Sequence, residues 1–116
     1  MNMNANDIRI CFLGDSYVQG TGDDECLGWA GRLCASARHA GHNITYYNLG
    51  VRRETSTDIA RRWLAECEPR LLPASENYLV FSFGANDVSL VDGQQRVRKD
   101  DTIANLHAML DNARTR

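Results

Sequence analysis

Residues 8–16, "IRICFLGDS", join an apolar run to a polar turn, and this pattern returns later in the chain. The run "IRICFL" (8–13) has strand length, is rich in branched and aromatic side chains, and stops at a glycine. Two later runs share these properties, "NITYYNL" (43–49) and "NYLVFSF" (77–83). The sequence therefore predicts three β-strands.

Helical patterns lie between these runs. We expect a first helix over residues 28–40, closed by Gly41 in a left-handed conformation. A second helix is expected to begin at Thr55, which forms a capping-box pattern with Asp58, and to end at Pro69. Apolar residues at helical spacing give the expected inner faces, which are Ala30, Leu33, Cys34 and Ala37 in the first helix and Ile59, Trp63 and Cys67 in the second.

A third helix is expected after Asp100 or Asp101, and the segment 86–99 before it is the longest irregular stretch. Strands that alternate with helices are typical of an α/β fold with a parallel sheet and right-handed crossovers. We therefore predict a single domain over residues 1–116. The expected inner stripe of the third helix consists of Ile103, Leu106, Leu110 and Ala113.

The composition is that of an ordinary globular protein, with 43% hydrophobic and 24% charged residues and a net charge of −2. The arginines are dispersed, so no nucleic-acid partner is expected. No apolar run approaches the ~20 residues of a membrane span, and "MNMNANDIRI" lacks the pattern of a secretion signal. The cysteines show no CxxC spacing, which predicts reduced thiols in a cytoplasmic protein: Cys11, Cys26, Cys34 and Cys67.

Each predicted strand is followed by residues that could do chemistry. Ligands of open parallel sheets bind at the carboxyl ends of the strands. Hydrolysis by a serine needs a hydroxyl and donors aimed at the developing oxyanion. Ser16 could supply the hydroxyl and one N–H, Gly50 a second N–H, and Asn86 a side-chain amide. Each alone could be an ordinary turn residue, but three at successive strand ends indicate a hydrolytic site.

The three blocks "FLGDSYVQGTG" (12–22), "YNLGV" (47–51) and "FSFGANDV" (81–88) resemble the first three sequence blocks of the SGNH hydrolases, also called GDSL lipases or esterases. The resemblance implies a three-layer α/β/α sandwich with a flavodoxin-like parallel sheet, in which the strand order is 2-1-3-4-5. Tyr17 stands where the family usually has a leucine.

The same resemblance implies roles for three residues. Ser16 matches the nucleophile of the family, and Gly50 and Asn86 match the donors that hold the oxyanion together with the Ser16 N–H. The implied activity is hydrolysis of an ester, such as one with a short acyl or acetyl group, and it requires no metal or organic cofactor. The implied partner is therefore a small ester or acyl substrate.

One element of the family pattern has no counterpart in the sequence. The family takes its general base from a histidine in a DxxH motif after two further strands, and neither His39, His42 nor His107 has an aspartate three residues before it. His107 is expected at the margin of the core. We therefore expect a domain truncated after its third strand-helix unit. We also expect weak activity at most, since a serine hydrolase without its triad keeps a rate enhancement of only ~10³ to 10⁴ over the reaction in water.

Further expectations concern the surroundings of these blocks. An unpaired third strand predicts a homodimer, or aggregation, through Leu79–Phe83. Asp15 and Asp87 are expected to fix their own turns through backbone hydrogen bonds. Arg52 and Arg53 could meet an anionic group of the substrate, or could simply be solvated loop charges.

Two other functions fit the sequence. The chain could be a catalytically dead module that binds or oligomerises on the same scaffold. It could also be a flavodoxin-like ligand-binding domain whose "GDSYVQGTG" loop holds a phosphate, although the loop has neither a GxGxxG pattern nor a P-loop lysine.

Overall fold

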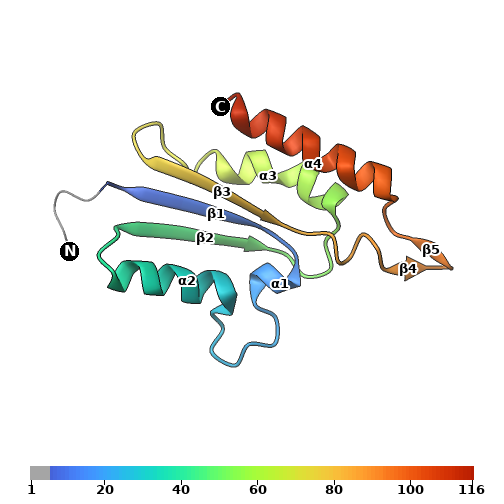
Figure 1. The fold of residues 1–116 in the computed structure, drawn as a ribbon, viewed down its shortest axis with the longest axis horizontal. Helices are drawn as coiled ribbons and strands as arrows, with labels where there is room; N and C mark the ends of the chain where they lie inside the picture. Colours follow the sequence, from blue (N-terminus) through green and yellow to red (C-terminus); the bar gives the residue numbers. More distant parts are fainter. Residues whose placement is uncertain (1–5) are drawn as a thin grey trace.

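A computed structural model describes residues 6–116, and a three-stranded parallel sheet runs through its centre (Figure 1). The strands are β1 (Ile8–Gly14), β2 (Ile44–Gly50) and β3 (Glu76–Ser82), in the order β2-β1-β3. All three predicted strands are confirmed to within a residue. The order matches the first three strands of the predicted flavodoxin-like sheet.

Helices cover both faces of this sheet (Figure 1). The four-residue α1 (Ser16–Gln19) and α2 (Gly28–His39) lie on one face, and α3 (Ser56–Cys67) and α4 (Lys99–Arg114) lie on the other. This arrangement confirms the predicted α/β/α layers. Sequence reasoning found α2, α3 and α4 but missed α1, which is too short to show a helical period.

The central strand β1 divides the core into two halves, because successive side chains of a strand point to opposite faces. Cys11 and Leu13 pack against α3 and α4, together with Ile59 and Trp63. Phe12 points the other way and packs with residues of α1 and α2. A strand segment buried on both faces needs consecutive apolar residues, which explains Cys11, Phe12 and Leu13; Arg9, nearer the start of the strand, is only half-buried.

The predicted helix caps are present. Gly41 follows α2 with φ of 100°. At the start of α3 the Thr55 hydroxyl accepts the Asp58 N–H at 3.4 Å, and the Asp58 carboxylate accepts the Thr55 N–H at 2.9 Å. This is the predicted capping box, and it fixes the direction in which the chain leaves the loop after β2.

The predicted inner stripe of α4 is only partly correct. Ile103 and Leu106 are 43% and 37% exposed, whereas Met109, which was not predicted, is buried. The reason is that the first half of α4 packs on α3 and makes a polar contact there, in which Asn105 donates to the Ser56 hydroxyl at 2.9 Å. The second half reaches the core under the sheet through Met109. Ala113 does pack against the core, as predicted.

Segment 86–99 is less irregular than predicted, because it contains a small antiparallel hairpin. Its strands are β4 (Leu90–Val91) and β5 (Gln94–Gln95). Asp92 and Gly93 form the turn with φ of 53° and 78°, which are the positive values that a tight hairpin turn requires.

Within residues 6–116, no helix is both long and apolar enough to cross a membrane. The expectation that the chain starts without a secretion signal rests partly on residues 1–5, which lie outside the described residues.

Candidate active site

The carboxyl ends of the three strands meet at one edge of the sheet. Gly14 at the end of β1 pairs with Gly50 on one side and with Ser82 on the other. A side chain at residue 14 has no room, because its Cβ would lie 2.3 Å from the Ser82 carbonyl oxygen and 2.4 Å from Val18. The segments that carry Ser16, Gly50 and Asn86 therefore begin side by side, as the sequence predicts.

Ser16 is the first residue of α1 and is half-buried. Asp15, which is 2% exposed, caps this helix: its carboxylate accepts the Tyr17 N–H at 3.0 Å. At the other end Gly20, with φ of 87°, donates its N–H to the Ser16 carbonyl at 2.9 Å. The prediction that Asp15 fixes its own turn is confirmed, and that turn holds Ser16 at the edge of the sheet.

Gly50 lies directly against the backbone of α1. A Cβ at this position would come within 2.4 Å of the Gln19 nitrogen and 2.8 Å of the Asp15 carbonyl oxygen, so only glycine fits. Its N–H donates to the side-chain oxygen of Asn48 at 3.0 Å, and the Asn48 amide donates to the Val18 carbonyl at 2.9 Å. Asn48 thus ties the end of β2 to α1.

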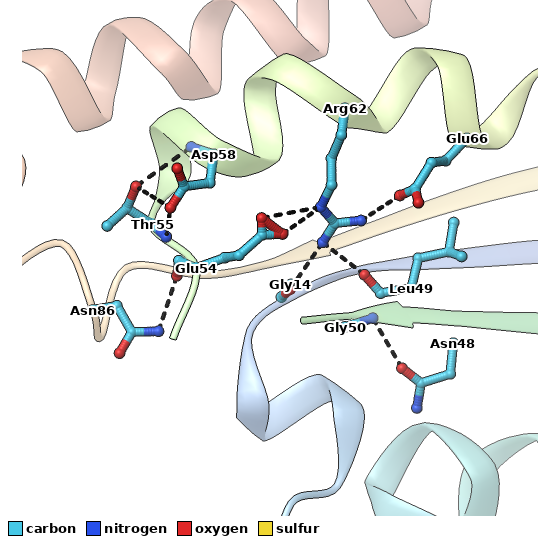
Figure 2. A network of polar contacts seen from close by, with 10 residues as sticks. All are labelled: Gly14, Asn48, Leu49, Gly50, Glu54, Thr55, Asp58, Arg62, Glu66 and Asn86. Atoms are coloured by element: carbon cyan, nitrogen blue, oxygen red, sulfur yellow. Dashed lines mark hydrogen bonds and ion pairs between the residues drawn. The ribbon is translucent and has the colours of Figure 1, made fainter. Parts of the chain in front are cut away.

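Asn86 lies beyond β3 and reaches the segment after β2. Its side-chain nitrogen donates to the Glu54 carbonyl at 2.9 Å (Figure 2). The loop that carries Asn86 is therefore tethered to the loop that leaves Gly50, although the two are far apart in sequence.

Asp87 does more than fix its own turn. It is 1% exposed, and its carboxylate accepts the Ser56 N–H of α3 and the Thr102 hydroxyl of α4, both at 2.7 Å. Its own N–H closes the local turn by donating to the Gly84 carbonyl at 3.1 Å, as predicted, but its carboxylate bonds outside that turn. It joins the start of two helices to the end of β3, because a buried carboxylate needs several donors and its own loop does not supply them.

Arg52 and Arg53 are both exposed in the turn after β2. Arg53 adopts φ of 74°, a conformation that costs a non-glycine residue energy and is uncommon outside turns and functional sites. Its carbonyl accepts a hydrogen bond from Arg96, after β5, at 2.9 Å. This turn therefore contacts the hairpin through its backbone.

None of the three histidines takes the position of a base for Ser16. His39 and His42 lie near the start of β2, and the seven residues of that strand put about 20 Å between its two ends. His107 is exposed on α4, so its predicted place at the core margin is wrong. Met109, and not His107, is the residue of α4 that turns into the core.

Arg62 of α3 was not among the predicted site residues, yet it lies at the centre of a polar network (Figure 2). Its guanidinium pairs with the carboxylates of Glu54 and Glu66 and donates to the carbonyls of Leu49 at 2.7 Å and Gly14 at 3.3 Å. The four-residue spacing of Arg62 and Glu66 predicts an ion pair on one face of a helix. No pattern in the sequence predicts the contacts of Arg62 with the carbonyls of Leu49 and Gly14.

An apolar hollow of about 350 Å³ lies beside the loop that carries Asn86. Its lining includes Gly84, Val88, Val97, Thr102 and Ile103. Because these residues come from the loop after β3 and from α4, the hollow exists only when α4 is packed in place.

Comparisons with known protein families and with solved structures point to the same kind of protein. A model of the GDSL-like lipase/acylhydrolase family matches residues 12–116. Among solved structures, the chain is similar to AlinE4, an SGNH-hydrolase family esterase, with 21% identity, a TM-score of 0.77, and coverage of 98% of this chain and 56% of that chain.

A second similar structure is the psychrotrophic esterase EstA from Pseudoalteromonas sp., inhibited by monoethylphosphonate, with 23% identity and a TM-score of 0.72. That match covers 92% of this chain and 54% of the other. The chain thus spans about half the length of these esterases. No curated protein sequence matches it significantly.

Proposed function

Since the chain belongs to the GDSL-like lipase/acylhydrolase family, we propose that it carries the nucleophile and the oxyanion donors of a serine ester hydrolase. The observation that supports this most directly is the placement of Ser16 on α1, whose backbone packs against Gly50, at the sheet edge where the loop of Asn86 also begins.

In this proposal the Ser16 hydroxyl attacks the acyl carbon of an ester. The carbonyl oxygen becomes negative, and the Ser16 N–H, the Gly50 N–H and the Asn86 amide stabilise it; one such donor is typically worth ~10² to 10³ in rate. The alcohol leaves with a proton, and water then releases the acid and regenerates Ser16. The substrate in this proposal is a small ester with a short acyl or acetyl group.

The Gly50 N–H is engaged by Asn48 at 3.0 Å. An acyl oxygen would have to share this N–H with Asn48 or replace it. An Asn48→Ala variant frees the N–H, so the rate should rise if Gly50 is a donor, whereas an unchanged rate would indicate that Gly50 has only a packing role.

The general base is the missing part. Because His39, His42 and His107 lie elsewhere, we infer that the base comes from residues outside this sequence. The 116 residues alone should then be weakly active at best, and added imidazole should substitute in part for the absent histidine.

The experiment is labelling with a fluorophosphonate in the presence of imidazole, followed by intact mass. We expect one adduct per chain, its loss in Ser16→Ala, and its retention in the control Ser36→Ala, which changes an exposed serine of α2. Labelling that persists in Ser16→Ala would refute the assignment of the nucleophile. No labelling of the unmodified chain would favour a second function, a binding module without catalysis, which is consistent with the engaged Gly50 N–H and the absence of a nearby histidine.

A further inference from the structure

We propose that Arg62 is the positioning residue of this site: it holds the backbone segments of Ser16, Gly50 and Asn86 in one arrangement. This inference rests on the proposed function, because it concerns the same three groups. Among residues 6–116, the polar partners of the Arg62 guanidinium are backbone carbonyls and carboxylates, so it acts through other residues rather than on a substrate.

The first contact is with the two strand ends. Arg62 donates from one nitrogen, Nη2, to the Gly14 carbonyl at 3.3 Å and to the Leu49 carbonyl at 2.7 Å. Gly14 lies two residues before Ser16, and Leu49 directly precedes Gly50. The guanidinium therefore bridges β1 and β2 at the point where their pairing ends, next to the hydrogen bond from the Val51 N–H to the Gly14 carbonyl.

The second contact reaches the loop of Asn86. The Nε of Arg62 pairs with the Glu54 carboxylate, and the backbone carbonyl of the same Glu54 accepts the Asn86 amide at 2.9 Å (Figure 2). Arg62 thus fixes the side chain of Glu54, and the backbone carbonyl of Glu54 fixes the side chain of Asn86. A shift of Arg62 would move the acceptor that orients the Asn86 amide.

Only arginine can make this set of contacts. The guanidinium offers five N–H donors in a fixed plane, whereas lysine offers a single charged nitrogen on a flexible stem. The side chains of Arg62 and Glu54 are 18% and 16% exposed, so their pairing is shielded from water more than a surface ion pair is. Glu66, at 38%, completes the charge balance on the outer side.

The test compares Arg62→Gln with Arg61→Gln, which removes the same charge from the exposed neighbouring residue. The first measurement is the rate of fluorophosphonate labelling at Ser16 with imidazole present. We expect Arg62→Gln to slow labelling at least about tenfold, since small displacements of reacting groups cost rates of this order, and Arg61→Gln to stay near the rate of the unmodified chain. Arg62→Lys keeps the charge but should not restore the rate.

The second measurement separates positioning from stability. Amide hydrogen exchange should speed up locally in Arg62→Gln, at Gly50 and in the loop of Glu54 and Asn86, while the core strand β1 keeps its protection. If Arg62→Gln labels at the normal rate, the proposal is wrong and the hydrolase assignment stands. If the unmodified chain does not label, the hydrolase assignment fails, and unchanged local exchange in Arg62→Gln and Arg62→Lys would then overturn the positioning role as well.

Discussion

The side-chain amide of Asn86 donates a hydrogen bond to the backbone carbonyl of Glu54 at 2.9 Å. This contact joins the loop after β3 to the loop after β2, and the next residue, Asp87, reinforces it by bonding the Ser56 N–H at 2.7 Å. The carboxyl edge of the sheet is therefore held together by polar contacts between loops and not by strand pairing alone.

Replacing Asp87 by alanine should destabilise the fold strongly. The change leaves the buried Ser56 N–H without its acceptor and leaves the Thr102 hydroxyl only the more distant Arg98 carbonyl at 3.3 Å. Unsatisfied donors and lost bonds to a charged group predict a decrease of about 2 to 4 kcal/mol in the free energy of unfolding, measured by urea denaturation. Asp111→Ala on the exposed side of α4 is the control and should change it little. Equal effects of the two variants would contradict the role of Asp87.

Replacing Gly50 by alanine should cost stability through a steric clash. The added Cβ would lie 2.4 Å from the Gln19 nitrogen, which is a backbone atom that cannot move alone. We expect a loss of about 1 to 3 kcal/mol or more in urea denaturation. Gly22→Ala is the control, because Gly22 has φ of 88° and a Cβ added there would meet no atom within 4 Å. This variant should lose only the conformational energy of a left-handed alanine, about 1 kcal/mol. A smaller loss at Gly50 than at Gly22 would mean that α1 gives way.

The four thiols should differ sharply in reactivity. Cys26 is exposed, and the other three are buried. The neighbouring Cys11 and burial raise the pKa of Cys67, and burial raises the pKa of Cys34. Titration with a disulfide reagent should therefore modify one thiol per native chain quickly and all four only after unfolding. Cys26→Ser should abolish the fast phase, and a fast phase that survives in this variant would show that the core opens readily.

The capping box of α3 should make stability depend on pH under acid conditions. The hydrogen bond from the Thr55 N–H lowers the pKa of Asp58. A carboxyl with a lowered pKa in the folded state stabilises the fold fully above its ordinary value of about 3.9, and this contribution is lost as pH falls toward the lowered value. Asp58→Asn should therefore show a shallower loss of unfolding free energy below about pH 4 than the unmodified chain. Asp24→Asn, at an exposed position, should follow the unmodified chain.

The outer edge of β3 should promote self-association. Within residues 6–116, β3 pairs with β1 alone, so the far side of Leu79–Phe83 has no strand partner. Unpaired strand edges template pairing with another chain, and we expect the molecular mass in light scattering to rise with concentration. Tyr78→Lys, which places a charge on an exposed part of this strand, should reduce the rise. A constant monomer mass at all concentrations would exclude pairing through β3.

The parts of the fold that were predictable have local signals. The apolar runs of β1, β2 and β3 and the pairing of Thr55 with Asp58 can be read within a few residues of sequence. The Asp92-Gly93 turn also has such a signal, since this dipeptide is typical of tight hairpins.

The parts that were not predictable depend on distant partners. The apolar period of α4 gives one face of a helix but cannot say which part of that face will be covered by α3 and which by the core under the sheet; hence Ile103 was expected inside and is 43% exposed. The contacts of Arg62 with Gly14 and Leu49 join residues that no short pattern connects. Ser16, Gly50 and Asn86 were placed at one edge only through the general geometry of parallel sheets.

The register of the sheet has a consequence for when the site forms. Gly14 pairs with Gly50 and with Ser82, so a slip of β2 or β3 by one residue would move its loop about 3.3 Å along the sheet and turn its side chains to the opposite layer. No pair of neighbouring elements contains all three candidate groups. In a folding intermediate in which β3 is not yet docked, Ser16 and Gly50 would be in position but Asn86 would not. Reactivity at Ser16 would therefore appear last and would report the docking of β3.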